Sequence, residues 1–346
     1  KRLLWTITIA TFLISANLDN LTTTVLMLVI MRNIVQNRRQ RMLIGSAIVL
    51  AANAGGGFTV IGDPAGVILW GGEAVTATNF SVYLFVPAVV AWVVPTLLIR
   101  MSLPDRLDVE WPAMPYRGDD TNLNRWQRII MLFVGIGGLW FIPTFHNITK
   151  LSPFLGALCV LSVLWVVNEA FNRKIINSDL MVQRRSPQSV QYGSLQLILF
   201  VMGIMLAFGV VTETGFFATV SEWLDYNIHN IWVIGVIAGL ISGVVDTFTV
   251  AMTALSMYPV VEAQDLELWA DADYMANFVQ NGAFWKLIVY TTSIGGCLLC
   301  FASSSGLALM KMERIHIGWY FRNITPKVAV GWLLGMIILW AEVAFL

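Results

Sequence analysis

The sequence predicts an all-α polytopic membrane protein, built as an inverted repeat with two re-entrant helical hairpins and two broken transmembrane helices. Four observations carry this prediction. The 346 residues are 57% hydrophobic and only 12% charged, whereas soluble domains carry about 25% charged residues. Apolar runs long enough to cross a bilayer recur along the chain. A polar sequence motif, called the repeated polar phrase below, occurs twice. The basic residues gather on one side of the predicted spans.

The repeated phrase indicates an internal duplication. SANLDNLT at 15–22 recurs as SGVVDTFT at 242–249, a shift of 227 residues, with serine, aspartate and threonine at the same offsets. A second pair follows in the same order, since Asn53-Ala-Gly-Gly with Gly66 downstream matches Ser293-Ile-Gly-Gly with Gly306 downstream, a shift of 240 residues. Polar breaks inside duplicated hydrophobic segments are typical of transporters whose binding site lies near the bilayer midplane.

The elements follow in order. The C-terminal part of repeat 1 occupies residues 1–110, with a hairpin at 3–35, a broken helix at 41–78 and a span at 81–100. A cytoplasmic linker at 111–125 joins it to repeat 2, residues 126–346. Repeat 2 contains spans at 126–143, 152–170 and 195–212, a hairpin at 231–258, a broken helix at 284–309 and a span at 327–346. Three spans precede the second hairpin and none precedes the first, so we expect about three spans upstream of Lys1.

The charges give the orientation. Of the 21 basic residues, 19 fall on the side that the positive-inside rule makes cytoplasmic, and only Lys150 and Lys286 fall on the other. The stretch 259–283 carries five acidic residues and no basic one, so we place it outside. Five crossings separate the two hairpins. Because five is odd, the hairpins enter from opposite faces, and their tips can meet inside the membrane.

Asp19 and Asp246 occupy the two predicted hairpin tips. A carboxylate at membrane depth is costly and is a functional candidate by default. The alternative is that each aspartate caps the helix that follows it, and the two roles are compatible. Hydroxyl and amide oxygens that suit a small hard cation surround them, namely Ser15, Asn17, Asn20, Thr22, Ser242 and Thr247.

The two breaks supply the other candidates. We expect Gly55–Gly57, like Gly295 and Gly296, to let the backbone leave helical geometry and expose polar groups. Asn53 and Ser293 begin the breaks, and Asp63 lies in the first break before Pro64. The matching place in the second break holds Ser303, aligned with Asp63, followed by Ser304 and Ser305. Capping is again the alternative reading of Asp63.

The predicted membrane interior holds carboxylates and no arginine or lysine. Such carboxylates favour cations and protons, so Asp19 and Asp246 are predicted to hold Na⁺ and to exchange it for H⁺. These are transported ions, and no cofactor is predicted. The chain offers no nucleophile with a base, no metal cluster and no nucleotide loop, so neither an enzyme nor a nucleic-acid partner is expected. The three cysteines lie in apolar segments and are interpreted as core residues.

At these residues the chain resembles the NhaD-type sodium/proton antiporters, within the ion transporter superfamily that also contains divalent-anion/sodium symporters. The resemblance rests on SANLDNLTTT, AANAGGGFTVIGD, the MYP at 257–259, and FWKLIVY followed by GG, SSSG and MERI. It implies an elevator-like motion, a homodimer and a multi-pass location in the bacterial cytoplasmic (inner) membrane. The chain departs from the family pattern at the residues after Asp63, at Thr247, and in the amino-acid sequence of the second break.

Two transport functions stay open. The first is antiport of Na⁺ (or Li⁺) against H⁺. The second is sodium-coupled symport of a small anion such as a dicarboxylate or sulfate, with the anion held at half-helix N-termini. A non-transporting membrane sensor or assembly subunit is the remaining possibility.

Overall fold

The computed structural model describes residues 2–104, 107–109, 124–149, 151–172, 199, 202–268 and 271–345. Within these ranges the chain is helical, with two isolated β-bridges and no β-strand. The all-α prediction is therefore confirmed for the described part. The predicted linker at 111–125 lies almost wholly outside it, as do the loop at 173–194 and the first residues of the predicted span 195–212.

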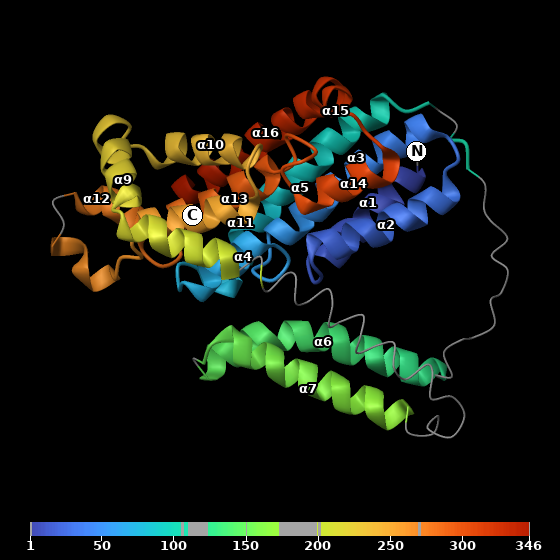
Figure 1. Ribbon diagram of the computed structural model, residues 1–346, viewed down its shortest axis with the longest axis horizontal. Helices are drawn as coiled ribbons and strands as arrows, with labels where there is room; N and C mark the ends of the chain where they lie inside the picture. Colours follow the sequence, from blue (N-terminus) through green and yellow to red (C-terminus); the bar gives the residue numbers. More distant parts are fainter. Residues whose placement is uncertain are drawn as a thin grey trace. The chain divides into compact units, whose positions relative to one another are not determined.

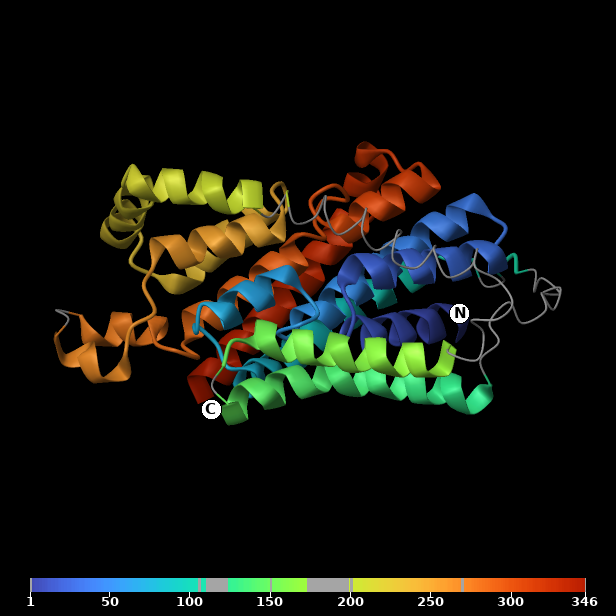
Figure 2. The same cartoon turned by 60° about the horizontal axis from the view of Figure 1, so that its bottom comes forward.

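The chain divides into two compact units. Unit 1 comprises residues 1–112 and 215–346, and unit 2 comprises residues 113–214. Unit 2 contains α6 (Arg125–Thr149), α7 (Pro153–Asn172) and a helix at Met202–Glu213. Helices α6 and α7 pack side by side, as Figure 2 shows. The boundaries of the two sequence repeats stay a prediction.

All the candidate residues lie in unit 1, whose helices are labelled in Figure 1. Its first part contains α1 (Arg2–Ser15), α2 (Asn20–Ile34), α3 (Arg38–Gly57), α4 (Pro64–Gly71) and α5 (Ala77–Met101). Its second part contains α9 (Phe216–Asn227), α10 (Ile231–Ser242), α11 (Thr247–Met257), η2 (Ala263–Leu268), α12 (Ala272–Met275), η3 (Ala276–Phe278), α13 (Ala283–Gly295), α14 (Ser304–Glu313), α15 (Ile317–Asn323) and α16 (Thr325–Phe345).

Helix length separates two kinds of apolar helix. Four described helices are long and apolar enough to cross a membrane: Ala77–Met101, Arg125–Thr149, Pro153–Phe171 and Thr325–Phe345. By contrast α1, α2, α10 and α11 have 14, 15, 12 and 11 residues. At 1.5 Å per residue each is shorter than about 25 Å and falls short of a bilayer core of about 30 Å. Each pair is interrupted at the repeated polar phrase.

The two broken helices occupy the centre of unit 1. Helix α3 packs against α1, α2, α5, α13 and α14, and every residue from Leu43 to Gly57 is buried. Every residue of α13 from Phe284 to Gly295 is buried as well. Helix α14 packs against α2, and α4 packs against α11. Each break is therefore enclosed by one hairpin and by the other broken helix.

The prediction that Gly55–Gly57 leave helical geometry is wrong. Helix α3 continues to Gly57, and the backbone turns only at 58–63. These glycines serve close approach instead, because a Cβ on Gly55 would overlap the carbonyl oxygen of Phe12 in α1. A Cβ on Gly295 would likewise overlap the carbonyl oxygen of Gly239 in α10. In both halves the break begins where a hairpin helix touches the backbone of the broken helix.

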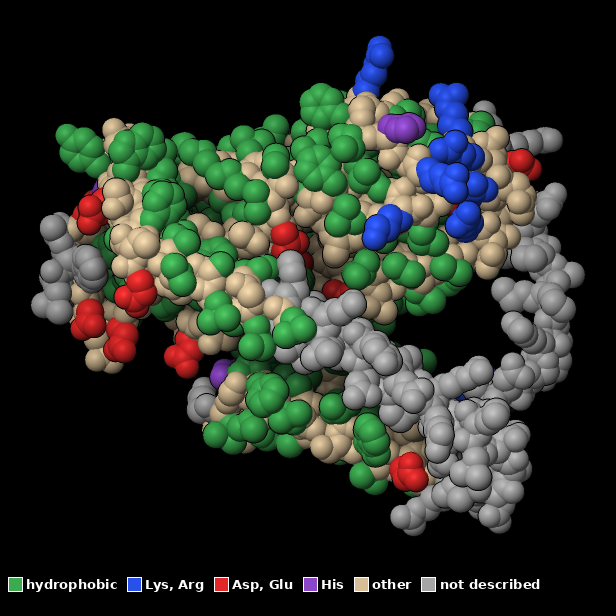
Figure 3. Space-filling view, in the orientation of Figure 1, with side chains coloured by type: hydrophobic (Ala, Val, Ile, Leu, Met, Phe, Trp, Pro, Cys, Tyr) green, Lys and Arg blue, Asp and Glu red, His purple; other side chains and the backbone are tan. Residues whose placement is uncertain are grey.

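The described charges of unit 1 are segregated. In Figure 3 most of the Lys and Arg side chains of unit 1 gather over α3 and α14, whereas many Asp and Glu side chains lie at the end that carries η2 and α12. At the acidic end, hydrogen bonds from the Tyr274 backbone and from His229 hold the pKa of Asp271 below its usual value. This segregation agrees with the orientation inferred from the positive-inside rule.

The Asp225 carboxylate joins the acidic end of unit 1 to the end of α11. Asp225 Oδ1 accepts hydrogen bonds from Tyr258 Oη at 3.1 Å and Tyr274 Oη at 2.7 Å, which joins α9, the end of α11 and α12. We expect Asp225→Ala to lower the free energy of unfolding by about 1 to 3 kcal/mol, because a half-buried phenol loses its acceptor. A thermal melt in detergent checks this, with exposed Glu222→Ala on the same helix as the control. Equal melting temperatures of the two variants would contradict it.

Candidate functional site

The most enclosed carboxylate of the candidate site is Asp63. It precedes α4 at the N-cap position but makes no capping hydrogen bond, and only 3% of the residue is exposed. Its Oδ1 accepts a hydrogen bond from Asn20 Nδ2 at 3.0 Å, and its Oδ2 accepts one from Ser293 Oγ. Asn20 begins α2 and Ser293 lies in α13. Capping is therefore excluded as the role of this carboxylate, which instead joins the first hairpin to the second broken helix.

A buried serine orients Asn20. Ser15 Oγ lies 2.8 Å from Asn20 Oδ1 and 2.8 Å from the carbonyl oxygen of Ala52, and can donate to either. Acceptance at Oδ1 leaves the Asn20 amide nitrogen pointing at Asp63. Thr59 Oγ1 donates to the Ala16 carbonyl at 2.8 Å and so ties the first break to the hairpin tip.

The second break forms a neutral counterpart. Asn53 Nδ2 donates to Ser303 Oγ at 3.3 Å and to Cys297 Sγ at 2.9 Å. Ser303 Oγ also accepts the Gly306 amide at 3.1 Å and caps α14. Ser305 Oγ is buried and finds no hydrogen-bond partner among the described residues, whereas Ser304 is exposed.

Both hairpin-tip aspartates cap helices. Asp19 is exposed, and its Oδ2 accepts from Thr22 N at 3.0 Å and from Thr22 Oγ1 at 3.2 Å. Asp246 is half-buried, and its Oδ2 accepts from the Phe248 amide at 3.2 Å. The capping alternative therefore describes what these side chains do in this structure.

The contacts repeat at the sequence shifts. Ser15 Oγ lies 2.8 Å from the carbonyl oxygen of Ala52, and Ser242 Oγ, 227 residues later, lies 2.9 Å from the carbonyl oxygen of Thr292, 240 residues later. Ser293 bonds to Asp63 just as its counterpart Asn53 bonds to Ser303, the counterpart of Asp63. Asn53 and Ser293, near the ends of α3 and α13, thus each bond to the residue that precedes the second half of the other broken helix.

The structure does not draw every predicted residue into this network. Ser304 is exposed, and among the described residues the hydrogen bonds seen for the Thr22 side chain go to Asp19, while Asn17 Nδ2 donates to Leu13 O at the end of α1. Thr247 is buried, and its methyl group faces Gly296. The sequence reasoning missed Cys297 and Thr59. The 240-residue shift could have identified Cys297, because it aligns this residue with Gly57, beside Ser293.

The charges around the candidate site favour the binding of a cation. The ion pairs seen among the described residues involve Glu313 and Asp271 and none of the three candidate aspartates. Asp63 lies close enough to Asp19 and Asp246 for their charges to interact with its own. The described residues hold no cluster of three His, Cys, Asp or Glu, and Asp63 is contacted by the amide N–H of Asn20 and the hydroxyl of Ser293. The carboxylate and hydroxyl oxygens are hard ligands, which suit a small alkali cation better than a transition metal.

Lys286 lies nearer to the candidate site than the sequence suggested. Lys286, placed outside the membrane by the charge pattern, is only 6% exposed, and its ammonium nitrogen lies 3.6 Å from the centre of the Tyr83 ring. It precedes Ser293 by seven residues on α13, which is about 10 Å along the helix. A buried cation of this kind could assist an anion.

Comparison with known proteins identifies similar sodium/proton antiporters. Sodium/proton antiporter 2 of Arabidopsis thaliana is 30% identical over 338 residues, which cover 97% of this chain and 76% of that protein. Sodium/proton antiporter 1 of the same plant is 31% identical over 337 residues, covering 97% of this chain and 55% of that protein. The Na⁺/H⁺ antiporter NhaD of Vibrio parahaemolyticus is 27% identical over 360 residues, covering 96% of this chain and 79% of that protein.

The resemblance to NhaD-type antiporters is therefore confirmed, and the chain is a multi-pass membrane transporter rather than an enzyme. The family profile described as "Citrate transporter" matches residues 1–279. The chain belongs to that citrate transporter family.

Proposed function

We propose that this chain is a secondary antiporter that exchanges Na⁺ (or Li⁺) for H⁺, with Asp63 as the central carrier and Asp19 and Asp246 at the two approaches. One observation carries the proposal. A buried carboxylate is held by two neutral donors, from the first hairpin and from the second broken helix, and has no ion-pair partner among the described residues. A charge that is buried in this way needs a proton or a bound cation.

The exchange follows from competition at this carboxylate. With a proton bound, Asp63 is neutral and the site can cross the membrane without sodium. With sodium bound, carboxylate, amide and hydroxyl oxygens replace part of the water around the ion, and the proton has left. Asp19 and Asp246 add negative charge near the site, which draws a cation toward it. A site that holds either ion but not both couples their fluxes in opposite directions.

The proposal includes an inverted repeat with two re-entrant hairpins, formed by α1 with α2 and by α10 with α11. The paired contacts at shifts of 227 and 240 residues support it, as do four apolar helices too short to span a bilayer. An elevator-like motion, a homodimer and the bacterial cytoplasmic membrane complete the proposal on the strength of the family resemblance alone.

Proton flux in proteoliposomes tests the function. We expect an imposed sodium gradient to move protons in the opposite direction without any added anion, and Asp19→Asn to weaken this movement. The control is a potassium gradient of the same size. Sodium uptake that occurs only when an anion is supplied, with no proton movement, would contradict antiport.

Sodium-coupled anion symport is the second candidate. It is favoured by the buried Lys286 and by the description of the matched family as citrate transporters. In this reading the sodium site is unchanged and the anion binds toward Lys286. Thermal stabilisation of the purified protein by citrate in the presence of sodium, lost in Lys286→Met, would support this candidate.

A further inference from the structure

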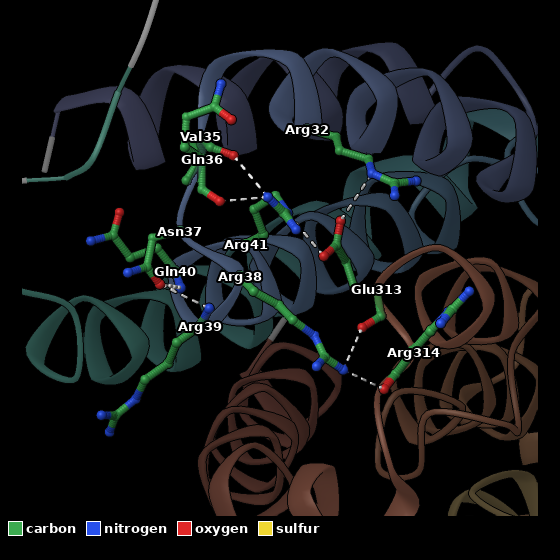
Figure 4. A network of polar contacts seen from close by, with 10 residues as sticks. All are labelled: Arg32, Val35, Gln36, Asn37, Arg38, Arg39, Gln40, Arg41, Glu313 and Arg314. Atoms are coloured by element: carbon green, nitrogen blue, oxygen red, sulfur yellow. Dashed lines mark hydrogen bonds and ion pairs between the residues drawn. The ribbon is translucent and has the colours of Figure 1, made fainter.

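Beyond the ion site, a second polar network joins the same two broken helices at their other ends. Figure 4 shows Glu313, the last residue of α14, between arginines of α2 and α3. Arg41 Nε donates to Glu313 Oε2 at 3.0 Å, and Arg32 Nε lies 3.9 Å from Oε1. Only 2% of the Glu313 side chain is exposed, against 17% for Arg41 and 53% for Arg32.

The arginines also bind the backbone of both segments. Arg38 Nη2 donates to the carbonyl oxygens of Glu313 at 3.3 Å and Arg314 at 3.0 Å. The last carbonyls of a helix lack partners within it and favour a cation, so this contact fastens the end of α14. Arg41 Nη1 donates to the carbonyl of Gln36 at 2.7 Å, which fastens the connection between α2 and α3. We call Arg32, Arg38, Arg41 and Glu313 the clamp.

The positive-inside rule does not explain the clamp. That rule concerns only the placement of arginine and lysine, whereas here a carboxylate is buried against Arg41 and Arg32 at the cost of its hydration. Arg314 adopts a left-handed conformation, with φ of 51°, at the point where its carbonyl meets Arg38. A local backbone conformation that L-residues disfavour is thus held by the clamp.

The position of the clamp suggests its purpose. It joins the N-terminal end of α3 to the C-terminal end of α14, and the opposite ends of these helices carry Asn53 and Ser303, which bond to each other. Twelve residues separate Arg41 from Asn53, about 18 Å along α3, and ten separate Ser303 from Glu313, about 15 Å. The helices α2, α3 and α14 pack against one another between these points. The pair is therefore fastened at both ends.

We propose that the clamp keeps α3 and α14 in register throughout the transport cycle, so that the Asn53–Ser303 half of the site stays assembled. Arg32, Arg38, Arg41 and Glu313 are positioning residues that act through Asn53 and Ser303. The competing role is a gate that opens in every cycle. What the site transports rests on the proposed function, but the register of the helices does not.

The first test uses two natural cysteines of the purified protein. Cys297 is fully buried and accepts the hydrogen bond from Asn53, whereas Cys159 is exposed in unit 2. We expect Glu313→Gln to raise the alkylation rate of Cys297 by about fivefold or more, because local opening between α3 and α14 becomes easier. The rate at Cys159, read by peptide mass spectrometry in the same sample, stays unchanged.

Two controls separate register from general stability. Arg39→Gln removes an exposed arginine from the same turn of α3 and is expected to leave the Cys297 rate unchanged. Asp225→Ala weakens the distant acidic end and is expected to do the same. A Cys297 rate in Glu313→Gln equal to that in the wild type would overturn the proposal, as would an equal rise in Asp225→Ala.

The second test separates a clamp from a gate. In proteoliposomes that hold Arg41→Cys with Glu313→Cys, a short bifunctional thiol reagent replaces the ion pair by a covalent bridge. We expect bridging to keep or restore sodium-driven proton flux, whereas a loss of about tenfold or more would identify a gate and refute the clamp. If the wild type itself shows no flux, the proposed function fails, while the Cys297 rates still decide the clamp.

Discussion

Asp63→Asn is expected to abolish sodium-dependent transport while leaving the fold intact. The amide can still accept from Asn20, and its NH₂ group can donate to Ser293 Oγ, so both hydrogen bonds of the site survive. The negative charge is lost. Removing one member of a buried charge pair costs about 2 to 5 kcal/mol, which corresponds to at least about a 30-fold loss of apparent sodium affinity. Sodium-driven proton flux and thermal stabilisation by sodium measure this effect.

The control for Asp63→Asn is Asp273→Asn, which neutralises an exposed carboxylate of α12 far along the chain from the site. It should keep wild-type affinity. A sodium response in Asp63→Asn equal to that of Asp273→Asn would contradict the central role of Asp63. Residual transport in Asp63→Asn that disappears when Asp19 or Asp246 is also neutralised would instead assign the carrier to the hairpin tips.

Gly55→Ala and Gly295→Ala are expected to destabilise the protein strongly and to similar extents. In each variant the new methyl group meets a backbone carbonyl, that of Phe12 or that of Gly239, and backbone cannot move aside as a flexible side chain can. Overpacking in a close-packed core costs about 1 to 3 kcal/mol or more. We expect a lower melting temperature and a weaker sodium response in both variants, because each contact lies next to a site-bearing helix end.

Gly71→Ala is the matched control, because a Cβ on Gly71 would meet nothing within 4 Å. It should melt at or slightly above the wild-type temperature, since alanine favours a helix more than glycine does. Similar losses in Gly55→Ala and Gly295→Ala would agree with the duplicated architecture. A large loss at one position and none at the other would contradict the view that the two breaks are packed alike.

Local patterns predicted the parts of the site that are local. The repeated phrase marked the interruptions between α1 and α2 and between α10 and α11, because polar residues inside apolar runs rarely continue a membrane helix. The 240-residue shift aligned Asn53 with Ser293 and Asp63 with Ser303. The shift could not reveal that Asn53 bonds to Ser303 and Ser293 bonds to Asp63, because these contacts depend on how the two breaks pack against each other.

Other features escaped the sequence for physical reasons. A run of glycines is consistent either with a break in a helix or with the close approach of another helix. Only the position of Phe12 in the structure decides between the two. A cysteine in an apolar segment reads as a core residue, and nothing local shows that Cys297 accepts from Asn53. The ranking of the carboxylates was also inaccessible, since Asp19 and Asp246 cap their own helices while Asp63 is enclosed by residues up to 230 positions away.

The measurement that tests the central claim most directly is the release of protons when sodium binds to the purified protein in a weakly buffered solution. Competition at Asp63 predicts that sodium displaces a proton from the wild type, that the release fades as rising pH empties the site of protons, and that Asp63→Asn releases none. Sodium binding that stabilises the wild type without releasing a proton at any pH would contradict the account.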